Sequence, residues 1–255
     1  MFKLPLFKII AGAFVIPWYD KGRFSRRLVL PTLLLVVIMA IWMQLESKVA
    51  ALNWSFLLLY WIAFSIFAVT CHRLILIDDN DSSNQFQINL SKREFRFLLR
   101  LIAVYLVMGM VLAVFMTILM NLSIGTEPVV NEASGEIFNE RMSQDAFEWF
   151  KTLAYIPALY VVGRISLVFP STAIDQDKGI KWSWQATKGN GMRMFVIVCV
   201  LPWLMSILLG LFWRENATLV EQALLGLIAY IVMAIEIFAL SLTYKEFQKM
   251  ESVEI

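Results

Sequence analysis

Long runs of apolar residues, separated by short polar segments, dominate the chain. The runs are continuous rather than alternating, which favours helices over the strands of a membrane barrel. A helix needs about 20 mostly apolar residues to cross about 30 Å of hydrocarbon. Six runs predict transmembrane helices, at residues 28–45, 52–71, 101–122, 152–169, 194–213 and 223–244. We therefore predict an all-α, polytopic membrane protein with one six-helix domain over residues 28–244.

The run 152–169 is the weakest of the six, because it contains Pro157, Gly163 and Arg164. Helices in lipid are held by packing and polar contacts, and small residues let two backbones approach closely. The candidate points of close approach are Gly109, Gly163, Gly210 and Gly226.

The first 27 residues have a different pattern. Apolar residues recur at helical spacing with Lys3 and Lys8 among them, at Phe2, Leu6, Ile9, Ile10 and Phe14. This spacing predicts an amphipathic helix in the membrane interface over residues 1–27, and a frayed apolar tail is the alternative. The run Ile9–Trp18 is short and no cleavage site follows it, so we expect no signal peptide.

Basic residues fall mainly on one side of the predicted spans. Of the 22 Lys and Arg residues, 18 lie on the side that carries both termini. The other side holds only Lys48, Arg141, Lys151 and Arg214. Since Lys and Arg gather in cytoplasmic segments, we predict that both termini, including the tail 245–255, are cytoplasmic.

Composition supports lipid as the solvent. Apolar residues make up 60% of the 255 residues and charged residues 16%, against roughly 45–50% and 25% in a soluble domain. The mean hydropathy is +0.70. These values exclude a water-soluble enzyme, a disordered chain and a disulfide scaffold. The net charge of +2 is too small to predict a nucleic-acid partner.

Basic and aromatic residues near the predicted cytoplasmic ends of the spans are expected to meet lipid headgroups. Among them, Ile180–Lys188 predicts a short interfacial helix that Gly189 terminates. The headgroup set comprises His72, Arg73, Arg96, Arg100, Lys181, Trp182, Trp184, Lys188 and Arg193.

Motifs of catalysis and metal binding are absent from the sequence. It contains no glycine-rich phosphate loop, no nucleophile elbow and no His-Glu-x-x-His motif. His72, Cys71 and Cys199 do not form the paired ligands at short spacing that zinc sites show. We expect no metal, no cofactor and no enzymatic activity.

Glu236 is the sharpest polar signal, because it interrupts the run 223–244 nine residues before Lys245. An ionised carboxylate inside a span costs at least about 2.5 kcal/mol, so Glu236 needs a partner or must take up a proton. Arg164 lies close enough to the end of its span to reach inward, so we predict a Glu236–Arg164 ion pair, with Arg100 or Arg73 as the next partners. The pair is either a clamp between helices or part of an ion or substrate pathway.

The segment 164–212 carries the run Arg-Ile-Ser-Leu-Val-Phe-Pro-Ser-Thr-Ala-Ile-Asp, then Trp-Ser-Trp at 182–184 and Met-Arg-Met-Phe at 192–195. It resembles the membrane domain found beside some bacterial glycerophosphodiester phosphodiesterases, which also occurs in stand-alone inner-membrane proteins of unknown role. The resemblance implies a six-span protein of the bacterial inner membrane. It implies no hydrolase activity, since the catalytic part of those enzymes is a separate soluble domain.

Three functions remain open from the sequence. The first is a non-catalytic inner-membrane protein that organises lipids or a partner membrane complex, through other membrane subunits or self-association. The second is a small transporter or channel with Glu236 and Arg164 as its polar site. The third is a lipid enzyme that uses His72, Asp78 and Asp81 at the inner surface.

Overall fold

The computed structural model describes residues 3–45, 53–77, 91–123, 129–130, 137–138, 144–176, 178–214 and 217–251. Within these ranges the fold is helical apart from one pair of two-residue strands. Six helices are long and apolar enough to cross a membrane, over Lys21–Met43, Trp54–Leu76, Lys92–Asn121, Trp149–Ala173, Gly191–Gly210 and Val220–Glu251. The predicted all-α fold with six membrane-spanning segments is confirmed.

The elements follow one another as short and long helices with a single strand pair. In chain order they are α1 (Leu6–Tyr19), α2 (Lys21–Leu45), α3 (Asn53–Leu76), α4 (Lys92–Ser123), β1 (Val129–Val130), β2 (Ile137–Phe138), α5 (Gln144–Ile165), α6 (Val168–Ala173), α7 (Ile180–Ala186), α8 (Gly191–Phe195), a π-helical segment (Val196–Val200), α9 (Leu201–Gly210) and α10 (Leu219–Glu251). The strands are antiparallel, with Val129 opposite Phe138 and Val130 opposite Ile137.

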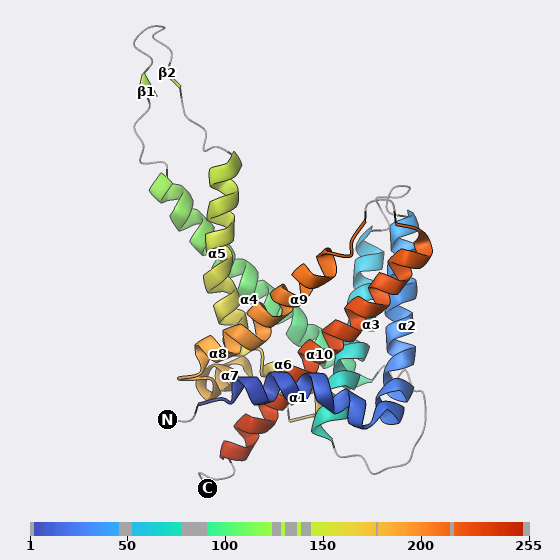
Figure 1. Ribbon diagram of the computed structural model, residues 1–255. Coiled ribbons are helices and arrows are strands. Elements are labelled where there is room, and N and C mark those ends of the chain that lie inside the picture. Colours follow the sequence, from blue (N-terminus) through green and yellow to red (C-terminus); the bar gives the residue numbers. More distant parts are fainter. Residues whose placement is uncertain are drawn as a thin grey trace.

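Two groups of long helices converge at one end of the molecule (Figure 1). Helices α2, α3 and α10 pack together, whereas α4 and α5 form a hairpin that leans away from them. Helices α1, α6, α7 and α8 lie at the convergent end, and both ends of the chain are also there. We call this the basic end, because the predicted spans place 18 of the 22 Lys and Arg residues on this side.

Helix α1 lies across the basic end and packs along α10 (Figure 1). Its inward face buries Ile9 and Ala13, and Leu4 just before the helix is also buried. Lys8 and Phe7 are exposed on the other face. The predicted N-terminal helix is therefore confirmed, but its exposed face carries Phe7, Val15 and Trp18 as well as Lys8, so its amphipathic character stays a prediction. The helix ends at Tyr19, and residues 21–27 belong to the first span instead of the interfacial segment.

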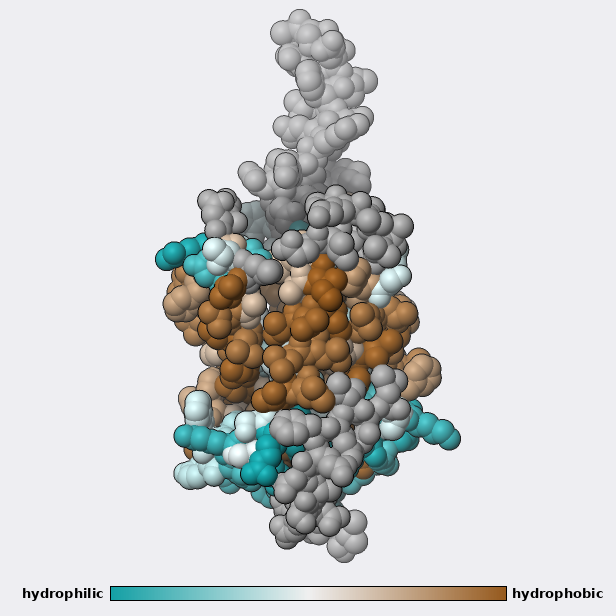
Figure 2. Space-filling model, turned by 90° about the vertical axis from the view of Figure 1, so that its right-hand side faces the viewer, coloured by the Kyte–Doolittle hydropathy of each residue, from teal (hydrophilic) through white to brown (hydrophobic). Residues whose placement is uncertain are grey.

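The surface between the two ends is apolar (Figure 2). On the face shown, hydrophobic side chains form a belt across the middle of the molecule, and a hydrophilic band lies below it at the basic end. Leu106, Trp203 and Ile231 are more than half exposed in this belt. Exposure of such side chains to water would be unfavourable, whereas a lipid environment accommodates them.

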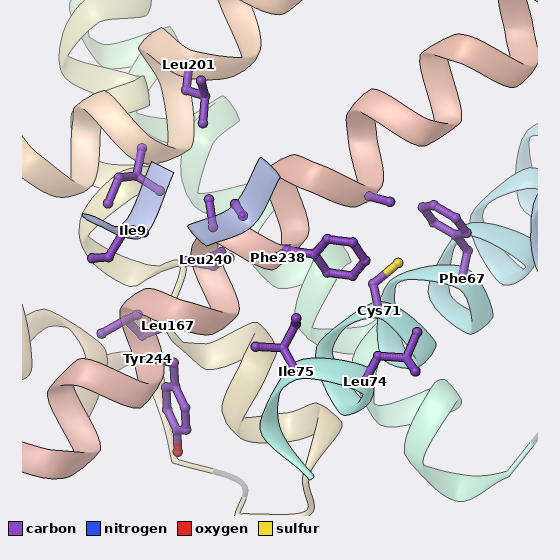
Figure 3. Packing of buried hydrophobic residues seen from close by; sticks show 14 of the residues in the cluster. Ile9, Phe67, Cys71, Leu74, Ile75, Leu167, Leu201, Phe238, Leu240 and Tyr244 are labelled. Carbon is purple, nitrogen blue, oxygen red and sulfur yellow. The ribbon is translucent and has the colours of Figure 1, made fainter. Parts of the chain in front are cut away.

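The main hydrophobic core joins α2, α3 and α10. Figure 3 shows Phe238 of α10 pointing toward Cys71 and Phe67 of α3. An edge-on contact joins Phe238 to Phe24 of α2, with ring centres 5.3 Å apart. Since these side chains come from α2, α3 and α10, the contacts hold three spans together.

Close backbone approach occurs at two glycines. A side chain at Gly163 would meet the backbone nitrogen of Phe195 at 3.2 Å, so the predicted close approach of this helix is confirmed. Gly191 has even less room, with Tyr160 at 2.4 Å, and the sequence prediction did not include it. Gly109, Gly210 and Gly226 have nothing within 4 Å, and the prediction for these three is wrong within the described structure.

Candidate functional site

Arg164 is buried at the end of α5 and is fully engaged by the segment that follows it. Its Nε donates a hydrogen bond to Oγ1 of Thr187 at 2.7 Å, and Nη2 donates to the carbonyl oxygen of Trp184. The guanidinium also stacks on the Trp184 ring, 4.2 Å from its centre. Oxygen acceptors and an aromatic face together stabilise this cation without a carboxylate.

The backbone of Arg164 is held by the same two turns of chain. Its carbonyl oxygen, at the end of a helix, accepts a hydrogen bond from Oγ of Ser183 at 2.9 Å and another from Oγ1 of Thr187 at 3.2 Å. Ser183 and Thr187 are one helical turn apart, so both hydroxyls reach one carbonyl. Arg164 therefore fastens α7 beneath α5 as a structural joint.

Glu236 lies elsewhere, midway along α10 and about 20–25 Å from either end of that helix. It lines a pocket of about 380 Å³ between α3, α4, α10 and the start of α9, which we call the Glu236 pocket. Aromatic side chains form much of its wall, namely Tyr60, Trp61, Phe64 and Tyr105. Among the described residues that line it, none is Lys or Arg.

The predicted Glu236–Arg164 ion pair is wrong. Arg164 is bound to Thr187 and Trp184, and Glu236 makes no ion pair or hydrogen bond with any residue of the described ranges. The physical reason is that α7 and the turn after it lie directly beneath Arg164 and supply its acceptors locally. Glu236 instead turns toward α3 and α4.

Two further pockets lie along α10, and one of them adjoins the Glu236 pocket. A pocket of about 480 Å³, which we call the apolar pocket, lies between α2, α9 and α10 and shares Tyr60 and Met233 with the Glu236 pocket. A third pocket of about 300 Å³, the outer pocket, shares Trp213, Gln222 and Leu225 with the apolar pocket. The three pockets follow α10 as a series from its first turn to Glu236.

Asp175 joins the basic end of α4 to the loop after α6. Its carboxylate accepts hydrogen bonds from Nε of Arg93 at 2.8 Å and from Nη2 of Arg96 at 2.5 Å. Asp175 has a positive φ of 60°, which an Asp adopts more readily than most residues. Arg73 donates from Nη1 to the carbonyl oxygen of Ala173 in the same loop, at 3.4 Å.

The next residues of that loop bind the end of α10. Oε1 of Gln176 accepts a hydrogen bond from the Tyr244 hydroxyl at 2.5 Å. Glu251 pairs with Lys178 and accepts a hydrogen bond from Nε1 of Trp182 at 2.7 Å. Residues 244–251 are therefore part of the folded domain, which corrects the predicted boundary of a separate tail at 245.

The N-terminal segment is held by residues between α7 and α8. The backbone N–H of Leu4 donates to Oδ1 of Asn190 at 2.9 Å, and Nη1 of Arg193 donates to the carbonyl oxygen of Leu4 at 2.6 Å. The predicted headgroup set contains Arg193, and Asn190 is not among the predicted site residues. Only the tertiary structure brings Leu4 to these residues, 186 positions away.

His72 is buried between α3 and α10 and is 1% exposed. Oγ of Ser241 donates to the carbonyl oxygen of Ile237, so it accepts a hydrogen bond from Nδ1 of His72 at 2.7 Å. The prediction that His72 meets lipid headgroups is wrong, because neighbouring helices cover its ring. Asp78 and Asp81, its proposed catalytic partners, lie outside the described residues.

Other members of the predicted headgroup set have side chains that are exposed or half-buried at the basic end. Lys181, Lys188 and Trp184 are exposed, while Arg100 and Trp182 are half-buried. The predicted short helix is confirmed as α7, and Gly189 follows it with a φ of 80°. In the described ranges, no three His, Cys, Asp or Glu side chains are grouped so that they could bind a metal.

Comparison of the chain with protein-family models, with curated proteins and with solved structures gives no match. The resemblance of segment 164–212 to a bacterial membrane-domain family therefore stays a prediction. In the structure this segment folds together as α6, α7, α8 and α9 around Arg164.

Proposed function

We propose that this chain is a non-catalytic protein of the bacterial inner membrane that binds anionic lipid and organises lipids or a partner membrane complex. The observation that supports this best is the group of exposed lysines at the basic end. There, Lys8 of α1 and Lys181 of α7 are exposed, and so are Lys3 just before α1 and Lys188 just after α7. Each Lys near an anionic leaflet contributes on the order of 1 kcal/mol.

The same charge distribution supports an orientation with both termini in the cytoplasm. The inner leaflet is the anionic one, and the positive-inside rule assigns the basic end to that leaflet. The apolar belt then occupies the hydrocarbon, and α1 and α7 lie at the headgroup level.

The test is lipid retention. The full chain is purified in a mild detergent, and its bound lipids are counted by native mass spectrometry after exposure to phosphatidylglycerol or phosphatidylcholine. We expect phosphatidylglycerol to be retained preferentially, and the preference to fall at least fivefold when Lys3, Lys8, Lys181 and Lys188 are all changed to Gln. The matched control changes Lys48, Arg141, Lys151 and Arg214 to Gln. An equal loss in both quadruple variants would contradict the proposal.

A second candidate function is transport of a small molecule, and one observation favours it. Glu236 is a carboxyl group in the middle of a span, and it lines a pocket that continues toward the end of α10 opposite the basic end. Ionisable residues inside spans mark substrate pathways in many membrane proteins. Uptake into liposomes, measured for wild type and Glu236→Gln, tests this candidate.

A further inference from the structure

The three pockets along α10 share one face of the helix. Gln222, Leu225, Ala229, Met233 and Glu236 line them in turn. These positions are three or four residues apart, which places them in a single stripe along a helix. The stripe changes in character along its length, from the polar side chain of Gln222 through apolar residues to the carboxyl group.

The apolar pocket lies next to the Glu236 pocket, and its lining suits a bound hydrocarbon chain. Its lining includes Val36 and Met39 of α2, Leu209 of α9 and Ala229 of α10. Tyr60 and Met233 line both this pocket and the Glu236 pocket, so the two spaces are neighbours without an intervening helix. A ligand that fills both must be apolar over most of its length.

The residues that line the Glu236 pocket favour binding of a cation. An ionised carboxylate in an apolar medium is unfavourable unless a cation pairs with it or the group takes up a proton, and the described residues provide no cationic partner. Trp61 and Tyr105 stack at 5.5 Å between ring centres, and both border the pocket. Aromatic faces attract ammonium groups, especially away from water.

A local irregularity of the backbone adjoins the same pocket. The π-helical segment Val196–Val200 ends two residues before Pro202, and Ile197, Val198 and Pro202 line the wall. Proline cannot donate to the carbonyl oxygen four residues earlier, and a π-helical turn is one way to accommodate that loss. Such turns in helices are frequent at functional sites.

We infer that the Glu236 and apolar pockets bind a single-chain amphiphile whose amine headgroup pairs with the Glu236 carboxylate and whose chain lies along α10. This inference rests on the second candidate function, transport of a small molecule, and names the class of ligand. It concerns binding of that ligand and not its movement across the membrane. In the predicted span 223–244, Glu236 lies eight residues, about 12 Å, from the nearer end, which is deeper than the headgroup of a bilayer lipid. The ligand is therefore a free amphiphilic amine and not a membrane lipid.

The experiment uses the full chain in nanodiscs of phosphatidylcholine. The probe is dodecylamine with a photoactivatable diazirine on its chain, and labelled peptides are mapped by mass spectrometry. We expect labelling on the α2 and α10 peptides of the apolar pocket, reduced at least tenfold in Glu236→Gln. Glu246→Gln is the matched control, because it is the same substitution on the same helix but affects a residue paired with Lys249 away from the pockets.

Two comparisons test whether binding requires the amine headgroup and whether the ligand is a free amine or a membrane lipid. Dodecanol with the same diazirine is expected to label weakly, and equally in wild type and Glu236→Gln. Nanodiscs that contain phosphatidylethanolamine are expected to leave labelling by the amine unchanged. Competition by phosphatidylethanolamine, or labelling by the alcohol that depends on Glu236, would overturn the proposed ligand class.

A second variant separates the site from folding. Met233→Phe narrows the junction of the two pockets without changing the carboxyl group, and it is also expected to lower labelling. Elution volume and thermal transition in detergent report whether each variant is folded. Labelling that is unchanged in both Glu236→Gln and Met233→Phe would overturn the inference. Binding without movement across liposomes would support the inference and contradict transport.

Discussion

The guanidinium carbon of Arg164 lies 4.2 Å from the centre of the Trp184 ring, and the same guanidinium donates a hydrogen bond to the Trp184 carbonyl oxygen. Two contacts between residues 20 positions apart close the chain into a loop around α6 and α7. Thr187 completes the loop, because its hydroxyl accepts from Arg164 Nε. A buried cation thus organises the segment without any acidic residue.

Loss of the Thr187 hydroxyl is expected to destabilise the protein. Thr187 is fully buried, and Thr187→Val replaces the hydroxyl by a methyl group of similar size. Arg164 Nε then lacks its acceptor, so we expect the free energy of unfolding to fall by about 1–3 kcal/mol. Unfolding by sodium dodecyl sulfate, followed by circular dichroism, measures the change. Thr187→Ser keeps the hydroxyl and should cost less; equal losses would contradict the role of this bond.

A methyl group at Gly191 is expected to be unfavourable. It would meet the Tyr160 hydroxyl at 2.4 Å and Cδ of Arg164 at 3.0 Å, so Gly191→Ala forces these two side chains of α5 to shift from their packed positions. Overpacking of this kind costs about 1–3 kcal/mol. The same unfolding assay applies, with Gly109→Ala as the control, because nothing lies within 4 Å of Gly109. A loss in Gly109→Ala as large as in Gly191→Ala would show that helix contacts at Gly191 are not the cause.

The number and order of the spans could be predicted from hydropathy, but the helix starts could not. Hydropathy placed two starts at residues 101 and 223, whereas α4 begins at Lys92 and α10 at Leu219. At both starts a hydroxyl residue accepts a hydrogen bond from an N–H of the first helical turn, and a Glu three positions after it accepts one in return from its N–H. The Ser91 N–H donates to Glu94 at 2.8 Å and the Thr218 N–H to Glu221 at 2.7 Å. That pattern is readable in the sequence and predicts the observed starts.

The partner of a buried polar group could not be predicted in the same way. Glu236 and Arg164 were paired because opposite charges in lipid attract each other over several ångströms. The choice between that pair and neutral acceptors depends on where Thr187 and Trp184 lie, which the fold after α5 decides. Sequence spacing carries no such information for segments that have no periodic pattern.

The contact between Leu4 and Asn190 is expected to keep α1 against the bundle. Asn190→Leu removes the acceptor of the Leu4 N–H and leaves a buried donor without a partner. We expect amide hydrogen exchange in residues 3–19 to become at least tenfold faster, while exchange in α3 stays unchanged. Asn190→Asp keeps an acceptor oxygen and should retain most of the protection. If both variants exchange like wild type, the hydrogen bond does not hold the segment.

The orientation of the bundle can be tested with single cysteines at its two ends. Cys71 and Cys199 are buried, so they are expected to react slowly with a membrane-impermeant maleimide. Lys181→Cys places a thiol on exposed α7, and Lys151→Cys places one near the start of α5, at the opposite end of that span from Arg164.

If the anionic cytoplasmic leaflet attracts the basic end, the maleimide added to intact cells should label Lys151→Cys once the outer membrane is permeabilised. Lys181→Cys should react only after the inner membrane is opened. The reverse pattern would place the basic end outside the cytoplasm, where the proposed pairing of its lysines with inner-leaflet lipid could not occur.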